Sequence, residues 1–146
     1  MEIILKRLEV KNFKGVKDLA IDFNPTITQI MGANHTGKTT TADAINWVLF
    51  GKNSEGLTVF GIDPKDEGNN IIHHLDNSVK LEIKADGRDI VLEKVRKETW
   101  KKVKGHDEEE LTGHTTDSFI DGNKYTAQDY QAEISNLISE SLFKAI

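Results

Sequence analysis

One eight-residue stretch, Gly32 to Thr39, constrains this chain more than any other feature. It reads Gly-Ala-Asn-His-Thr-Gly-Lys-Thr and matches the phosphate-binding pattern G-x-x-x-x-G-K-[ST] at every fixed position. The two glycines let such a loop adopt positive φ and turn its backbone N–H groups toward a phosphate. A helix that begins near Lys38 adds the positive end of its dipole. The stretch therefore predicts a phosphate-binding loop that holds a nucleotide.

The side chains of this loop have separate expected roles. Lys38 brings a mobile positive charge to the β- and γ-phosphates, and Thr39 offers a hydroxyl to a Mg²⁺ ion that keeps most of its waters. The alternative is a glycine-rich strand-to-helix turn that binds nothing, and the complete pattern disfavours it. The predicted nucleotide contacts in this region are Gly32, Ala33, Asn34, His35, Thr36, Gly37, Lys38, Thr39 and Thr40.

The flanking sequence fits a strand, a loop and a helix. Residues 26–31 form a β-branched and apolar run opened by Pro25, which is typical of a buried strand. Residues 39–50 carry apolar side chains at helical spacing, and Gly51 follows as a helix-ending residue.

Composition narrows the class of protein. The chain has 146 residues, of which 37% are hydrophobic and 29% charged, so residues 1–146 are expected to form a single globular domain. It has no cysteine, which excludes a disulfide framework and a thiolate metal site and fits a reducing cytoplasm. No apolar run approaches membrane-spanning length. The net charge of −5 argues against non-specific nucleic-acid binding by the whole surface.

Most of the remaining chain has the alternation of β-strands. A first hairpin is expected from residues 1–13 and 16–23 around Lys14-Gly15, and residues 52–70 read as an exposed loop with an apolar island at 57–62 that suggests a short strand. An antiparallel meander is expected next, with strands at 79–85 and 90–95 joined around Asp86-Gly87, an extension through 100–103, a polar loop at 105–110 and a return strand at 111–120.

The C-terminal region is predicted to be helical. Thr126 precedes an acidic third position, which is typical of a helix start. The apolar face of this helix would consist of Tyr130, Ile134, Leu137 and Ile138, and a last short helix is expected at 142–146.

Histidines and basic residues receive less specific interpretations. The five histidines show no helical pair with a carboxylate, so solvated loop positions are favoured over a metal site. Trp47 is expected in the core. A basic stretch around Trp100 could follow a nucleic-acid backbone, but acidic neighbours favour a solvated hairpin face; its members are Lys94, Arg96, Lys97, Lys101, Lys102 and Lys104.

Three segments together carry a family resemblance: "LEVKNFKG", "ITQIMGANHTGKTTTADAINWVLFGK" and "LFKAI". The chain resembles the start of the SbcC and Rad-fifty type DNA-repair ATPases, which belong with RecF, RecN and the SMC proteins. The resemblance is specific over residues 1–52 and loose over 53–146. It implies an α/β fold, the N-terminal lobe of an ABC-type P-loop ATPase head with an antiparallel meander around the P-loop helix, and ATP with Mg²⁺ as ligands.

Two further contacts come from this resemblance. Asn34 matches the family's loop Asn, which faces the γ-phosphate and the attacking water. Lys14 matches the basic residue of the family's "NF[RK]" segment, which approaches the phosphates. The chain departs from the family at His35, where Gly is usual, and a reduced affinity for nucleotide is expected because His tolerates a left-handed backbone less well than Gly.

The resemblance also implies parts that these 146 residues lack. The family's Gln loop, signature Ser motif and Asp-Glu strand end are absent, so no catalytic residue is assigned here. The implied partners are the C-terminal lobe of the same head, a second head in a head-to-head dimer, DNA and a partner nuclease, with ATP hydrolysis coupled to DNA double-strand break repair. No membrane partner is implied.

The competing interpretation is a small, complete P-loop protein, either a nucleotide kinase or a GTP switch. A kinase would need a lid with several arginines, whereas this chain has only Arg7, Arg88 and Arg96. A GTP switch would need an N-K-x-D motif, which is missing. The ATPase lobe is therefore favoured.

Overall fold

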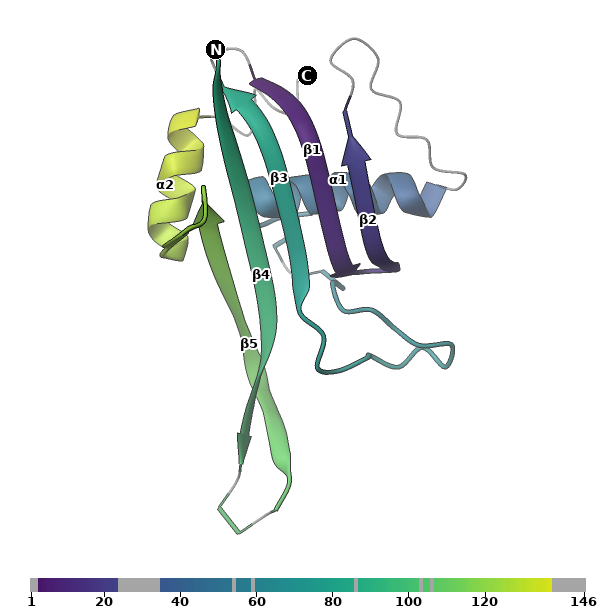
Figure 1. Ribbon diagram of the computed structural model, residues 1–146. Coiled ribbons are helices and arrows are strands. Elements are labelled where there is room, and N and C mark those ends of the chain that lie inside the picture. Colours follow the sequence, from purple (N-terminus) through teal and green to yellow (C-terminus); the bar gives the residue numbers. More distant parts are fainter. Residues whose placement is uncertain are drawn as a thin grey trace.

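The computed structural model describes residues 3–23, 35–53, 55–58, 60–85, 87–102, 104–105 and 107–137. This part of the chain forms one antiparallel sheet with the strand order β2-β1-β3-β4-β5-β6, and two helices (Figure 1). Helix α1 runs across the strands on one face of the sheet, and α2 lies at the side of β4 and β5 (Figure 1). The elements are β1 (Ile3–Phe13), β2 (Val16–Asp22), α1 (His35–Phe50), β3 (Asn77–Ala85), β4 (Arg88–Lys102), β5 (Glu109–Ile120), β6 (Asn123–Tyr125) and α2 (Ala127–Leu137).

The core lies between the sheet and α1. Alternate residues of the three central strands turn inward, as a period of two requires for a sheet with one buried face. Trp47 of α1 is 6% exposed and its ring lies 5.6 Å from that of Phe13, so its predicted core position is confirmed. The fully buried core side chains of these elements include Leu8, Val10, Ala44, Val48, Leu49, Val79, Leu81, Ile83, Ile90 and Leu92.

The predicted hairpins are present, with some changes of boundary. The β1–β2 and β3–β4 pairs turn where expected, and β4 continues to Lys102 as one long strand. The β4–β5 hairpin extends well beyond the rest of the sheet (Figure 1). The strand expected at 57–62 was wrong for the described residues of that stretch, which instead form loop contacts such as the carbonyl of Ile62 accepting from Lys14.

Two other features of the sheet differ from expectation. Glu109 and Glu110, expected in a loop, begin β5 because they pair with Lys101 and Lys102 across the hairpin. The short strand β6 was missed, since three residues are too few for a visible alternation. Helix α2 begins as predicted: Thr126 Oγ1 accepts from the N–H of Asp129 at 3.1 Å. The expected strand at 26–31 and helix at 142–146, and Ile138, lie outside the described residues.

Helix α1 begins earlier than expected, at His35 instead of Thr39. The apolar periodicity used to predict it starts only at Ala42, so the polar first turn carried no signal. The helix ends at Phe50 as predicted, and Gly51 follows with φ +70 and an N–H that donates to the Trp47 carbonyl at 2.9 Å. Neither described helix is long and apolar enough to cross a membrane.

Side chains from β4 and α2 satisfy the carbonyl end of α1. Lys94 Nζ donates to the carbonyl of Trp47 at 3.0 Å, and the Tyr130 hydroxyl donates to the carbonyl of Val48 at 2.6 Å. The last turn of α1 contains no basic residue of its own, so Lys94 supplies the positive charge that favours a helix C-terminus. Lys94 is buried, and this burial lowers its pKa to about 8. The expected solvated position of Lys94 was therefore wrong.

The buried ammonium of Lys94 predicts a pH-dependent stability. Its folded pKa lies below the ordinary value of 10.5, so between about pH 8 and 10.5 the unfolded chain binds more protons than the folded one. The free energy of unfolding therefore rises with pH in this window. Between pH 7.5 and 9.5, the free energy of unfolding of the wild type should rise by about 2 kcal/mol relative to that of Lys94→Met, as measured by urea unfolding.

The matched control is Lys97→Met, because Lys97 lies on the same strand but is exposed. That variant should keep the wild-type pH profile. Staying below pH 10 avoids ionisation of tyrosines in the unfolded chain, which matters because burial raises the pKa of Tyr130. Parallel profiles for the wild type and Lys94→Met would contradict a buried, charged Lys94.

Candidate nucleotide-binding site

The described part of the predicted phosphate loop begins with the first residues of α1. Gly32, Ala33 and Asn34 lie outside the described residues, and the next five residues of the motif form the first turn and a half of the helix backbone. Thr40, the last predicted contact, is 2% exposed. A glycine-bearing segment that leads directly into a helix N-terminus is the arrangement that binds phosphate groups in many proteins. The nucleotide contacts of residues 32–40 remain predictions.

Lys14 lies against the same helix. Its Nζ is 2.6 Å from Oδ2 of Asp43, a carboxylate that is only 4% exposed. Asp43 follows Thr39 by four residues in α1, a rise of about 6 Å along the helix axis. The Lys14 ammonium group thus contacts α1 one helical turn from the backbone of Thr39. Sequence reasoning missed Asp43, although its i+4 spacing from Thr39 was a usable signal.

The backbone around Lys14 is held in an unusual conformation. Lys14 has φ +54 and Asn12 has φ +51, values that non-glycine residues rarely adopt. Two contacts hold this turn: the N–H of Lys14 donates to the carbonyl of Ile62 at 2.7 Å, and the carbonyl of Asn12 accepts from Asn77 Nδ2 at 2.6 Å. Strained turns of this kind persist where neighbouring contacts fix them, and they concentrate at functional sites.

A cavity of about 310 Å³ opens beside Lys14. Its lining combines two ammonium groups, one carboxylate and two glycines, which leave room for a ligand to approach the backbone; the lining residues are Lys14, Gly15, Gly61, Asp63 and Lys65. Asp63 accepts from Arg96 Nη1 at 2.8 Å, so its negative charge is paired with a residue behind the cavity wall. Lys14 is likewise paired with Asp43, so the remaining positive charge among these lining residues is that of Lys65, which favours an anionic ligand such as a phosphate chain.

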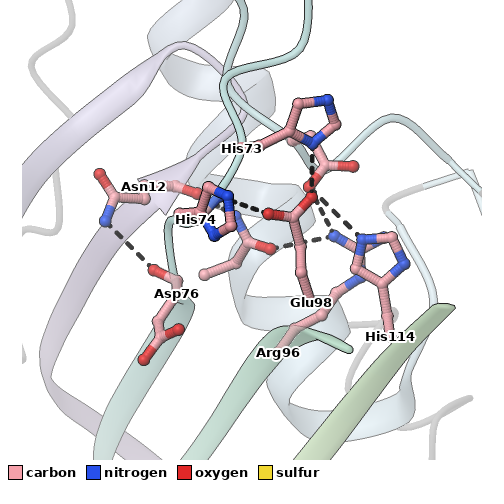
Figure 2. Close-up of polar contacts among 9 residues, drawn as sticks. Asn12, His73, His74, Asp76, Arg96, Glu98 and His114 are labelled. Carbon is pink, nitrogen blue, oxygen red and sulfur yellow. Dashed lines mark hydrogen bonds and ion pairs between the residues drawn. The ribbon is translucent and has the colours of Figure 1, made fainter. Parts of the chain in front are cut away.

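A polar cluster borders this wall on the β4–β5 hairpin (Figure 2). Glu98 has a side chain that is 5% exposed, and its carboxylate accepts from His73 Nδ1 at 2.7 Å and from the N–H of His74. The ring of His74 stacks on Trp100, with centroids 4.5 Å apart. His114 Nε2 lies 4.0 Å from Asp63. These contacts attach the segment before β3 to the hairpin.

The environment of Glu98 keeps its carboxyl group ionised. Burial alone would raise the pKa of Glu98, but the hydrogen bonds from His73 and from the N–H of His74, with the nearby His73 and His114, outweigh it and lower the pKa. Because the folded pKa is depressed, these contacts stabilise the fold above the ordinary glutamate pKa and are lost as acid protonates the group.

The prediction for the histidines holds for His73 and His74, which are exposed and lie in the segment before β3, although both contact Glu98 on β4. His114 lies on strand β5, so its expected loop position was wrong. The sequence could not show the contacts with Glu98, because they join residues 24 and 25 positions apart. His106 lies outside the described residues. Within the described ranges, no group of three or more His, Asp or Glu residues could hold a metal ion.

The members of the basic stretch on β4 are of two kinds, those with inward-facing side chains and those with exposed side chains. Lys94 and Arg96 point inward and have partners, whereas Lys97, Lys101 and Lys102 are exposed as expected for a solvated hairpin face. The exposed three match the prediction, and the inward pair does not. Alternation explains why Lys94 and Arg96 face inward and Lys97 does not, because successive side chains of a strand face opposite sides of the sheet. It does not explain Lys101 and Lys102, which are adjacent near the end of β4 and both exposed.

Comparisons with known proteins agree with this arrangement. The family model described as "AAA domain" (AAA_23) matches residues 7–145. The chain is 48% identical over 48 residues to the chromosome partition protein Smc of Halothermothrix orenii, covering 32% of this chain and 4% of that protein. It is 41% identical over 44 residues to the DNA replication and repair protein RecF of Lactococcus lactis subsp. cremoris, covering 30% and 12%. The chain thus spans a small fraction of the length of these relatives.

A solved structure shares the fold over most of both chains. It is described as "Structural biochemistry of ATP-driven dimerization and DNA stimulated activation of SMC ATPases", and it covers 95% of this chain and 82% of its own, with a TM-score of 0.67 and 19% identity. The chain therefore belongs to the AAA_23 family of AAA domains, and it has the fold of the N-terminal lobe of an SMC/RecF-type ABC ATPase head.

Proposed function

We propose that this chain is the ATP-binding N-terminal lobe of an SbcC/Rad-fifty-like ATPase. The observation that carries the proposal is the complete phosphate-loop pattern at residues 32–39, which leads into α1 in a fold of the SMC head type. The position of Lys14 supports it independently, because a lysine from a distant turn lies against the same helix. In this proposal residues 1–146 act as one lobe.

The residues present fit a nucleotide polyphosphate with Mg²⁺. The N-terminal amides of α1, Lys38 and Lys14 would neutralise the phosphates, and Thr39 would offer its hydroxyl to the metal. Mg²⁺ keeps several waters and uses phosphate oxygens as ligands, so a site without a cluster of carboxylates suits it. Asn34 would donate to the γ-phosphate. The bound Mg²⁺ would neutralise phosphate charge, while the chain's own residues bind and orient the nucleotide.

The action of the whole protein is part of the same proposal. We infer that a C-terminal lobe and a second head complete the site, and that hydrolysis is coupled to double-strand break repair or other DNA processing in the cytoplasm. Support comes from the names of the relatives, a chromosome partition protein and a DNA replication and repair protein, and from the description of the SMC structure as dimerising through ATP. DNA and a partner nuclease would then be the macromolecular partners.

An amide-shift titration tests the site directly. Adding Mg²⁺ with a non-hydrolysable ATP analogue should shift backbone amides of residues 34–40 and of Lys14 at the lowest ligand concentrations, because the loop N–H groups and the Lys14 ammonium group are expected to lie nearest the phosphates. The amide signals of residues 97–102 in the hairpin should shift little. Shifts centred on that exposed basic face instead would overturn the assignment of the phosphate loop.

A further inference from the structure

We propose that Arg96 is a positioning residue for the nucleotide, and that it acts by fixing Lys14 from behind the cavity wall. The proposal rests on the proposed function, since it assumes that Lys14 meets a phosphate. Arg96 itself lies on β4, and it reaches the Lys14 turn through two different partners. One partner belongs to the cavity wall, and the other holds the end of β1.

The first partner is Asp63. Arg96 Nη1 donates to Asp63 Oδ1 at 2.8 Å, and the two side chains are only 17% and 19% exposed. Asp63 lines the cavity beside Lys14, and its neighbour Ile62 accepts from the Lys14 N–H at 2.7 Å. Arg96 therefore fixes the wall segment that holds the Lys14 backbone, and it also occupies the Asp63 carboxylate.

The second partner is Asn77, the first residue of β3. Arg96 Nη1 donates to Asn77 Oδ1 at 3.0 Å, and Asn77 Nδ2 donates to the carbonyl of Asn12 at 2.6 Å. Asn77 is 1% exposed, so this relay is shielded from water. Asn12 lies near the end of β1, two residues before Lys14, and both residues have positive φ. Both routes from Arg96 thus converge on the turn that carries Lys14.

Loss of Arg96 would change the site in two ways that act together. The wall and the strained turn would lose a shared anchor, which increases the freedom of Lys14. Asp63 would also lose its nearest cationic partner, with only His114 left at 4.0 Å, in a cavity shared with Lys14 and Lys65, where its carboxylate competes with phosphate for the ammonium groups. Both changes weaken phosphate binding without removing any residue that touches the nucleotide.

The test is a double-mutant cycle on the affinity for Mg²⁺–ATP, measured by calorimetry with the full chain. Arg96→Gln should weaken binding by about tenfold, because a charged hydrogen-bonding anchor is lost. In a Lys14→Met background the same change should cost less than about twofold, because Arg96 acts through Lys14. Lys97→Gln removes the same charge from the next residue on the exposed face, and it should bind like the wild type.

Arg96→Lys is a second variant that keeps the proposal testable if Arg96→Gln fails to fold. It keeps the charge but lacks the guanidinium's planar array of donors, so it should fold and show an intermediate loss of affinity. Arg96→Gln and Arg96→Lys both binding like the wild type would overturn the proposal, as would equal losses with and without Lys14. If the wild type itself bound no nucleotide, the proposed function would fail instead, so the two failures are distinguishable.

Discussion

The isolated chain is expected to bind Mg²⁺–ATP without hydrolysing it at a useful rate. Phosphoryl transfer needs a positioned water and charge stabilisation on all sides of the γ-phosphate, and the predicted loop with Lys14 supplies one side. Steady-state phosphate release should stay near the roughly 10⁻⁴ s⁻¹ of an unassisted P-loop site. Supplying the C-terminal lobe of the same head should raise it by at least about 10³-fold, with DNA as a further stimulant.

The controls for this prediction distinguish an ATPase lobe that needs further parts from a complete enzyme. Lys38→Ala should abolish the stimulated rate, which excludes a contaminating ATPase. A fast rate from the isolated chain that also disappears in Lys38→Ala would show that the 146 residues are self-sufficient. That result would favour the small P-loop enzyme, such as a nucleotide kinase, over the ATPase lobe.

Replacing Lys38 with Ala is expected to weaken nucleotide binding by at least about tenfold. The lysine is predicted to donate a charged hydrogen bond to the β- and γ-phosphates, and such bonds contribute about 1.5–3 kcal/mol. Stability should change by less than about 0.5 kcal/mol, because the residue is expected to be a ligand donor and not a core element. Calorimetric titration and urea unfolding of the same preparations measure both quantities.

A matched variant sharpens the interpretation of Lys38→Ala. Lys52→Ala removes the same charge just beyond the other end of α1, so it reports any general effect of lost positive charge on affinity. It should bind nucleotide as the wild type does. If Lys38→Ala lost affinity only in proportion to a loss of stability, the phosphate-donor role would be wrong.

The fold could be predicted largely because its signals are local. The β3–β4 turn at Asp86-Gly87 and the N-cap at Thr126 are short-range patterns with known backbone geometry, and the elements beside them form as expected. The first turn of α1 and strand β6 were predicted wrongly because neither contains enough periodic apolar residues to give a local signal.

Only the part of the candidate site that lies in one continuous segment of the sequence could be predicted. The phosphate loop is continuous in the sequence, and so its chemistry was visible there. The contact of Lys14 with Asp43 spans 29 positions, and that of Arg96 with Asp63 spans 33. No local pattern reports such contacts, because they depend on which strands become neighbours in the sheet.

Lys94 shows how a basic stretch can mislead. Its neighbours Glu93 and Val95 suggest nothing unusual, yet alternation on β4 turns Lys94 toward the end of α1, where Trp47 offers a free carbonyl lone pair. Predicting this would have required the position of α1 relative to β4. Amphipathic lysines can cover apolar surface while their ammonium group meets a polar partner, and here that partner is a helix terminus.

The most direct test of the central claim is a calorimetric titration of the 146-residue chain with ATP in the presence of Mg²⁺. The account predicts saturable binding of one nucleotide per chain, with ADP competing and AMP at least about tenfold weaker, because the loop recognises the β- and γ-phosphates. No saturable binding, or an affinity independent of the number of phosphates, would contradict it.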